Sequence, residues 1–257
     1  MPPEFPAPAR TPVVSYLALR RAVGVTGLAF PVVLLFGGWM VGVPVQDDIS
    51  SYYHTPLRDV FVGTLCGAAA FLFCYQGEGR AENWTANVGC VAALGAAFFP
   101  IDADSAPPYT RTVPGLIHSL SGGLFFLTLG CYSLVHFPRG GEEDGEEEGG
   151  ESVRTTAGHG KGWWRNVVYR VSGVVILLAT PAMGAYLFLF PDAWREVCDR
   201  WNALFWLEGI AAWAFAAAWL TKGRAIGAEL ALDLLALAEG RLPGPLRPPD
   251  APGRPRR

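Results

Sequence analysis

The sequence has none of the short cysteine motifs that hold metals or exchange disulfides. Its five cysteines include no CxxC pair. Four of them, Cys66, Cys74, Cys90 and Cys131, fall inside apolar runs, where a free cysteine behaves as a small hydrophobic residue. Only Cys198 falls in a polar segment. A disulfide framework and a thiolate metal site are therefore not expected.

Charged residues are also scarce, at 17% of the chain against 51% hydrophobic residues. The net charge of −3 combines an acidic stretch, Glu142–Glu151, with an arginine-rich C-terminal tail. No basic patch with interleaved aromatic residues occurs, so nucleic acid is not an expected partner. The N-terminal MPPEFPAPARTPVV lacks a charged region followed directly by an apolar core and a cleavage site. No cleaved signal peptide is expected, and the first membrane helix would target the chain.

The sequence is rich in long apolar runs. Each run has about 17–24 residues, enough to cross roughly 30 Å of hydrocarbon as a helix. Backbone groups must be hydrogen-bonded inside a membrane, so these runs are predicted to be helices. The predicted fold is all-α, an integral membrane bundle of six transmembrane helices. The six spans are Val23–Val43, Asp59–Tyr75, Trp84–Pro100, Pro114–Phe137, Val167–Phe190 and Trp201–Leu220.

Small residues are frequent inside these runs, as in GTLCGAAA, GCVAALGAA and GIAAWAFAAAW. Small residues let helix backbones approach closely, so a tightly packed bundle is expected. The pair Thr180-Pro181 predicts a kink near the middle of the fifth span.

The distribution of Lys and Arg predicts that both termini are cytoplasmic. With the N-terminus inside, 16 of the 20 basic residues fall on the cytoplasmic side, as the positive-inside rule requires. The four on the outer side are Arg58, Arg111, Arg195 and Arg200. Six tryptophans fall near span ends, as in an aromatic belt, namely Trp39, Trp84, Trp163, Trp164, Trp194 and Trp201.

The predicted organisation is one membrane domain with polar extensions. Residues 1–12 form an N-terminal cytoplasmic tail, and residues 13–222 form the six-helix domain. Residues 138–162, with the sequence GGEEDGEEEGGE at their core, are predicted to be a flexible cytoplasmic loop. Residues 223–257 are predicted to contain an amphipathic cytoplasmic segment, Ile226–Leu242, and a Pro/Arg-rich tail.

Polar residues gather on the predicted outer side of the bundle. They come from Asp47–Gly63, from Pro100–Ser121, and from the connection between the last two spans together with Glu208. The predicted polar cavity is formed by Ser50, His54, Arg58, Asp59, Asp102, His118 and Glu208.

His118 and Glu208 are the deepest members of this set. His118 lies about 6 Å and Glu208 about 10 Å inside their spans, at a rise of roughly 1.5 Å per residue. A carboxylate inside the membrane costs about 2.5–3.5 kcal/mol, so it is expected to face the bundle and find a partner. The predicted pair is Glu208 with His118, and Ser119, Ser121, Arg58 and Arg111 are alternative partners.

The same residues allow other interpretations. Polar side chains at helix ends often only anchor and satisfy the bundle. Catalytic zinc takes three protein ligands, and His54 and His118 with a carboxylate would supply them, but no HExxH motif occurs. Ser50 or Ser51 with His54 and Asp59 would form a hydrolase set, but no GxSxG motif occurs. No cofactor is expected.

Five motifs resemble the Frag/DRAM/Sfk superfamily of six-span membrane proteins, and bacterial membrane families with the same layout. In chain order they are ISSYYHT, DVFVGTLCGAAAFLF, NWTANVGCVAALGAAFFP, HSLSGG and LEGIAAWAFAAAWLTKG. The resemblance covers roughly Val13–Lys222 and implies six spans. It also implies that His118, Glu208 and the pair Ile49-Ser50 are the transferable positions.

Members of that superfamily are linked to plasma-membrane lipid organisation, to lipid remodelling of GPI anchors, and to autophagy and lysosomal function. The loop YYHTPLRD and the acidic cytoplasmic loop depart from the eukaryotic pattern, so a lysosomal role is not expected. The Ala/Gly/Pro/Arg-rich composition is typical of a GC-rich bacterium, which would place this multi-pass protein in the cell membrane.

The expected function is binding, sensing or organising a membrane lipid or other amphiphile at the outer polar cavity. The first alternative is a ceramidase-like intramembrane lipid hydrolase, with or without a metal, built from His54, His118, Asp59, Asp102 and Glu208. The second alternative is a structural membrane subunit. Membrane lipids are the expected partners.

Overall fold

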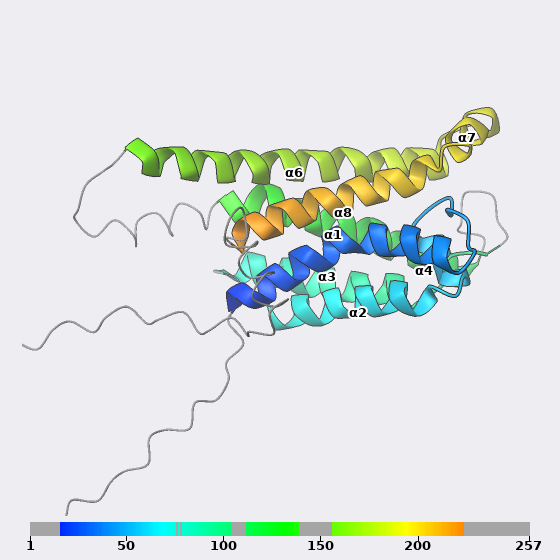
Figure 1. The fold of residues 1–257 in the computed structure, drawn as a ribbon, viewed down its shortest axis with the longest axis horizontal. Coiled ribbons are helices and arrows are strands. Elements are labelled where there is room, and N and C mark those ends of the chain that lie inside the picture. The colour runs from blue at the N-terminus through cyan, green and yellow to red at the C-terminus, as the bar shows by residue number, and fades with distance from the viewer. Residues whose placement is uncertain (1–15, 76, 78, 104–111, 139–155, 224–257) are drawn as a thin grey trace, which may run out of the picture.

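The computed structural model describes residues 16–75, 77, 79–103, 112–138 and 156–223, and within them every regular element is helical. Six long helices lie side by side, and the short helix α7 lies at one end of the bundle (Figure 1). The helices are α1 (Tyr16–Met40), α2 (Arg58–Cys74), α3 (Arg80–Phe98), α4 (Val113–Cys131), α6 (Thr156–Phe188), α7 (Asp192–Asp199) and α8 (Ala203–Lys222). A 3₁₀ turn, η1 (Ser50–His54), precedes α2, and a π-helix, η2 (Tyr132–His136), continues α4.

Each of the six predicted spans overlaps one long helix. The largest difference is at α6, which begins at Thr156 and not at Val167. The apolar run marks only the part of a helix suited to lipid, and a helix can continue beyond it into water. Most of the predicted acidic loop, the N-terminal tail and the C-terminal segment lie outside the described residues.

Four helical segments in the described part of the chain are long and apolar enough to cross a membrane. They are Leu19–Met40, Val113–His136, Trp163–Phe188 and Ala203–Lys222. The other two long helices are less suited, α2 by its length of 17 residues and α3 by its polar start with Arg80 and Glu82. Four such segments indicate a membrane protein.

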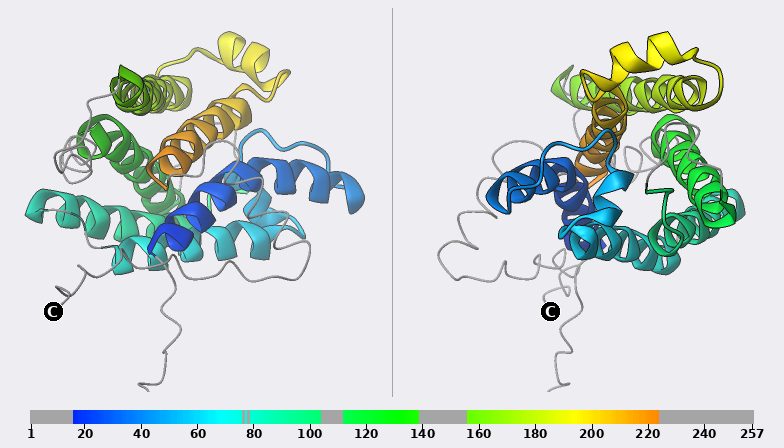
Figure 2. Two further views of the ribbon diagram at one scale, coloured as in Figure 1. Left: turned by 60° about the vertical axis from the view of Figure 1, so that its left-hand side comes forward. Right: turned by 90° about the vertical axis from the view of Figure 1, so that its right-hand side faces the viewer.

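The long helices follow one another around a ring. Helix α2 packs on α3, α3 on α4, α4 on α6, α6 on α8 and α8 on α1, and a looser contact between α1 and α2 closes the ring. The end-on view in Figure 2 shows this order. We call the end at which α2, α4 and α8 begin the polar end.

Glycines set the closest helix contacts in the ring. A Cβ on Gly95 would lie 2.3 Å from Ser121 Oγ, and one on Gly173 would lie 2.9 Å from the backbone nitrogen of Leu134. Neither space admits a side chain. The prediction that small residues let these backbones approach is therefore confirmed for α3 with α4 and for α6 with η2.

An aromatic cluster fills the interior toward the opposite end. Trp219 is fully buried, with ring centroids of Phe71, Phe137 and Phe215 at 5.1, 4.9 and 5.1 Å. Tyr132 from η2 also contacts it, at 5.8 Å. This cluster joins α2, η2 and α8, and two of its rings, Phe71 and Phe215, also line the cavity described below.

Helix α6 continues through Pro181 without ending. Proline removes a backbone donor from the helix interior. The residue before the proline, Thr180, donates its hydroxyl to the carbonyl of Ile176, one turn earlier, at 2.9 Å.

Candidate functional site

The loop between α1 and η1 is bound to the start of α8. The carbonyl of Asp47 accepts a hydrogen bond from the backbone N–H of Phe205 at 2.9 Å. The side-chain amide of Asn202 donates to the carbonyl of Gln46 at 3.2 Å. The first N–H groups of a helix have no partner inside the helix, so the loop satisfies one of them here. Segments more than 150 residues apart in sequence are joined in this way.

Glu208 completes this connection from one turn deeper in α8. Its Oε2 accepts a hydrogen bond from the backbone N–H of Ile49 at 2.6 Å. Its other carboxylate oxygen has no hydrogen-bond partner among the residues that the structure describes. Glu208 also lines the cavity, so this second oxygen is available to a ligand.

Asp48 is a buried carboxyl beside Glu208, with 1% of its surface exposed. Its two oxygens accept hydrogen bonds from the Ser51 backbone N–H at 2.6 Å and from the Ser51 hydroxyl at 2.9 Å. This arrangement satisfies a backbone N–H in the first turn of η1, as a capping side chain does. Burial raises the pKa of Asp48 to about 6, with a smaller contribution from Asp47, while the Ser51 hydrogen bonds act in the opposite direction.

Asp47, the preceding residue, is only partly buried. Burial raises the pKa of its carboxyl above the usual value, and the charge of Asp199 adds to the effect. The loop thus brings two acids with raised pKa values toward α8.

His118 and His54 bind the chain that follows α3. His118 Nδ1 donates to the carbonyl of Phe99 at 2.8 Å, and His54 Nε2 donates to the carbonyl of Ile101 at 2.7 Å. Beyond the end of a helix such carbonyls need donors from elsewhere. His118 is buried, with 3% exposed, and its ring stacks on Phe61 at 6.4 Å. Both imidazoles therefore help to hold the cavity wall.

The predicted direct pair between Glu208 and His118 is not formed. Both residues are described, and each is hydrogen-bonded to a backbone group and not to the other. Both line the same cavity, as expected from their similar depth. Counting residues along two spans predicts a shared level in the bundle, but not the direction of each side chain.

The remaining predicted site residues divide into two groups. Ser50 and Asp59 line the cavity. His54, Arg58 and Asp102 are described but are not among the residues that line it. Arg58 donates to the Tyr53 hydroxyl at 2.8 Å and lies over its ring at 4.5 Å. Asp102 accepts hydrogen bonds from the N–H and hydroxyl of Thr112, which caps α4.

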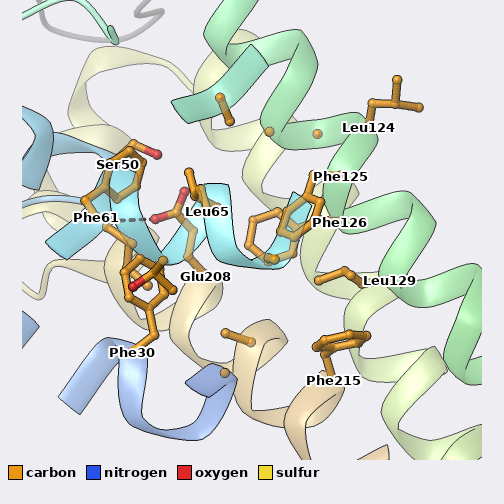
Figure 3. A pocket seen from close by; sticks show the side chains of 18 of the residues that line it. Phe30, Ser50, Phe61, Leu65, Leu124, Phe125, Phe126, Leu129, Glu208 and Phe215 are labelled. Carbon is orange, nitrogen blue, oxygen red and sulfur yellow. Dashed lines mark hydrogen bonds between the residues drawn. The ribbon is translucent and has the colours of Figure 1, made fainter. Parts of the chain in front are cut away.

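A cavity of about 1130 Å³ lies inside the ring of helices. Among the residues that the structure describes, its charged and imidazole lining groups are all at the polar end, namely Asp48, Asp59, His118 and Glu208. In Figure 3 the oxygen atoms of Ser50 and Glu208 lie at one side, and the rings of Phe125, Phe126 and Phe215 lie at the other. On α2 the lining extends from Asp59 to Cys74, about 22 Å at roughly 1.5 Å per residue.

Five glycines widen the cavity. A Cβ on any of them would meet no atom within 4 Å, and all five are lining residues. They are Gly63, Gly67, Gly122, Gly123 and Gly184. Exposed small residues Ala22, Thr26 and Ala70 also line it, along the loose contact between α1 and α2. The same residue type therefore closes some helix contacts and leaves space at others.

Two functional features were not predicted from the sequence. One is the Ile49 N–H as the partner of Glu208, which no side-chain pattern shows. The other is Asp48 as a buried cap. Its signal is present in the sequence, because an acid three residues before Ser51 is a typical capping arrangement.

Two members of the predicted hydrolase set, His54 and Ser51, are hydrogen-bonded to groups outside that set. His54 Nε2 is bonded to a carbonyl, and the Ser51 hydroxyl donates to Asp48. In the ranges that the structure describes, no three His, Cys, Asp or Glu side chains are grouped so that they could hold a metal ion.

No protein-family model, curated protein or solved structure matches the chain.

Proposed function

We propose that this membrane protein binds a lipid or another amphiphile in the cavity, with the polar head beside Glu208. The observation that carries the proposal is that the charged and imidazole groups among the described lining residues lie at one end of a cavity whose remaining lining is mostly apolar. Its length of about 22 Å along α2 exceeds the roughly 15 Å of one leaflet in a hydrocarbon core about 30 Å thick. A single acyl chain therefore fits along the apolar part.

The proposal includes six spans, both termini in the cytoplasm, and a location in the cell membrane. With this topology the polar end faces the outer leaflet. Three described arginines lie at that end, Arg58, Arg195 and Arg200, while Arg20, Arg21, Arg80, Arg165 and Lys222 lie at the opposite end. The larger basic group would then be cytoplasmic, in agreement with the positive-inside rule. The resemblance to the Frag/DRAM/Sfk superfamily is part of this proposal.

The test introduces larger side chains into the cavity and measures how much lipid the purified protein carries. In a Gly123→Leu/Gly184→Leu variant, two side chains enter space that is now empty. A steric conflict of this kind costs roughly 1–3 kcal/mol, so we expect the lipid that co-purifies with the protein to fall roughly 5- to 150-fold. Mass spectrometry of lipid extracted from the purified full-length protein measures the change.

The matched control is Gly79→Leu. Gly79 precedes α3, has no atom within 4 Å of an added Cβ, and does not line the cavity. Its lipid content is expected to equal that of the wild type. Equal lipid content in the filled variant and the control would refute the proposal.

A further inference from the structure

The charged groups that line the cavity are all acids. Within the described part of the chain, Asp48, Asp59 and Glu208 line it, and no Lys or Arg does. The neighbouring arginine, Arg58, is held against Tyr53 by a hydrogen bond of 2.8 Å and by its position over the ring.

Asp48 and Glu208 flank the backbone of Ile49 and interact electrostatically. The hydrogen bonds that these two carboxylates accept from described residues come from the Ile49 and Ser51 N–H groups and from the Ser51 hydroxyl. These donors are neutral. Burying ionised carboxylates without a counter-ion is costly, and a cation placed between them offsets the cost.

We propose that the head group bound at this end is an ammonium, so that the ligand is a long-chain amine. This inference rests on the proposed function. An ammonium carries three N–H donors, and the polar end offers acceptors for them. Glu208 has a free carboxylate oxygen, Ser50 lines the cavity, and His118 in its neutral form has Nε2 as an acceptor because Nδ1 donates to Phe99.

The aromatic residues at the polar end favour the same head group. The rings of Phe30 and Phe61 are 6.1 Å apart, both line the cavity, and both lie beside Glu208 in Figure 3. A cation near the face of an aromatic ring is attracted to it. An anionic head group would instead meet three carboxyls and no basic side chain among the described lining residues.

The experiment compares three ligands that share one tail. Hexadecylamine, hexadecanol and hexadecanoic acid are titrated separately into the detergent-solubilised full-length protein at pH 8, and native mass spectrometry measures bound ligand. We expect the amine to bind at least about tenfold more tightly than the acid, with the alcohol between them.

Two variants test the source of the preference. Glu208→Gln keeps an oxygen for the Ile49 N–H, and Asp48→Asn keeps one for Ser51, so both should fold. In each, the ratio of amine to acid affinity should fall below about threefold while the alcohol still binds. Glu196→Gln, an exposed acid on α7 outside the cavity, is the control and should keep the wild-type ratio.

The outcomes separate this inference from the proposed function. Equal or tighter binding of the acid, or a preference that survives in both variants, overturns the ammonium assignment. If all three ligands bind equally and the Gly123→Leu/Gly184→Leu variant loses them all, amphiphile binding stands and the inference fails. If none of the three binds to the wild type, both fail. If neither variant folds, the ratio of amine to acid affinity in the wild type decides by itself whether the ammonium assignment holds.

Discussion

At the scale of single residues, Asp48 links the stability of the fold to pH. Its carboxyl has a pKa of about 6 in the folded protein, against an ordinary value of 3.8. The folded protein therefore binds this proton more tightly than the unfolded chain does. The stabilisation is complete below about pH 4 and is lost as the pH rises through 6. A difference of this size corresponds to roughly 3 kcal/mol.

We expect Asp48→Asn to flatten the pH dependence of stability. The amide oxygen still accepts from Ser51, but nothing titrates at this position. Thermal unfolding of the wild type should lose roughly 3 kcal/mol more than the variant between about pH 4 and 7. Asp192→Asn, which changes a fully exposed acid, should follow the wild type. Identical curves for wild type and Asp48→Asn would show that Asp48 is not the responsible group.

The sequence predicted the residues of the polar end better than their contacts. Glu208 and His118 were expected at one depth because each lies a countable number of turns inside a span. Their actual partners, the Ile49 N–H and the Phe99 carbonyl, are backbone groups of other segments. Every residue carries such groups, so no residue type reveals which of them will be used.

At the scale of secondary structure elements, the long helices were predictable and the short ones were not. An apolar run inside a membrane must be helical because its backbone cannot bond to water. The elements η1, η2 and α7 instead depend on their surroundings. In η1 the Ser51 N–H needs Asp48, and α7 follows Pro191 with Arg195 donating to carbonyls at the end of α6. The π-helix η2 has Tyr132 bonded to the carbonyl of Glu82.

The contact between η2 and α6 is the place where a single added carbon should be most harmful. In Gly173→Ala the new Cβ would lie 2.7 Å from the Cβ of Leu134 and 2.9 Å from its backbone nitrogen. Backbone cannot rotate away as a side chain can, so we expect a loss of roughly 1–3 kcal/mol in unfolding free energy. Unfolding by denaturant in detergent micelles measures it.

The matched change is Gly63→Ala in α2, where no atom lies within 4 Å of the added Cβ. It should be neutral or stabilise by up to about 1 kcal/mol, because alanine favours the helix. Equal destabilisation by both changes would mean that the close approach at Gly173 does not determine the result.

At the scale of the whole molecule, exposed tryptophans mark both ends of the bundle. The six residues expected in the aromatic belt are exposed by 59% to 75%. Trp39, Trp194 and Trp201 lie at the polar end, and Trp84, Trp163 and Trp164 lie toward the other. Indole rings at these two levels suit the two interfaces of a membrane.

Cysteine labelling distinguishes six spans from four. Three long helices, α3, α4 and α6, separate Arg80 from Asp192. In a version without the five native cysteines, Asp192→Cys should react with a membrane-impermeant maleimide on intact cells. Arg80→Cys should react only after permeabilisation. Labelling of both residues from one side would show that α3 does not cross the membrane, and the reverse pattern would invert the orientation.

The hydrogen bond between the Ile49 N–H and Glu208 also determines when the polar end can form during synthesis of the chain. Its two residues are 159 positions apart, and the nearby contacts of Gln46 and Asp47 with the start of α8 span 156 and 158 positions. A ribosome adds about 5–20 residues per second, so Ile49 would wait roughly 8–30 s for its partner to be synthesised. The polar end of the cavity therefore comes into existence only with the last helix. A nascent chain that stops before α8 lacks both Glu208 and the part of the cavity wall that α8 forms.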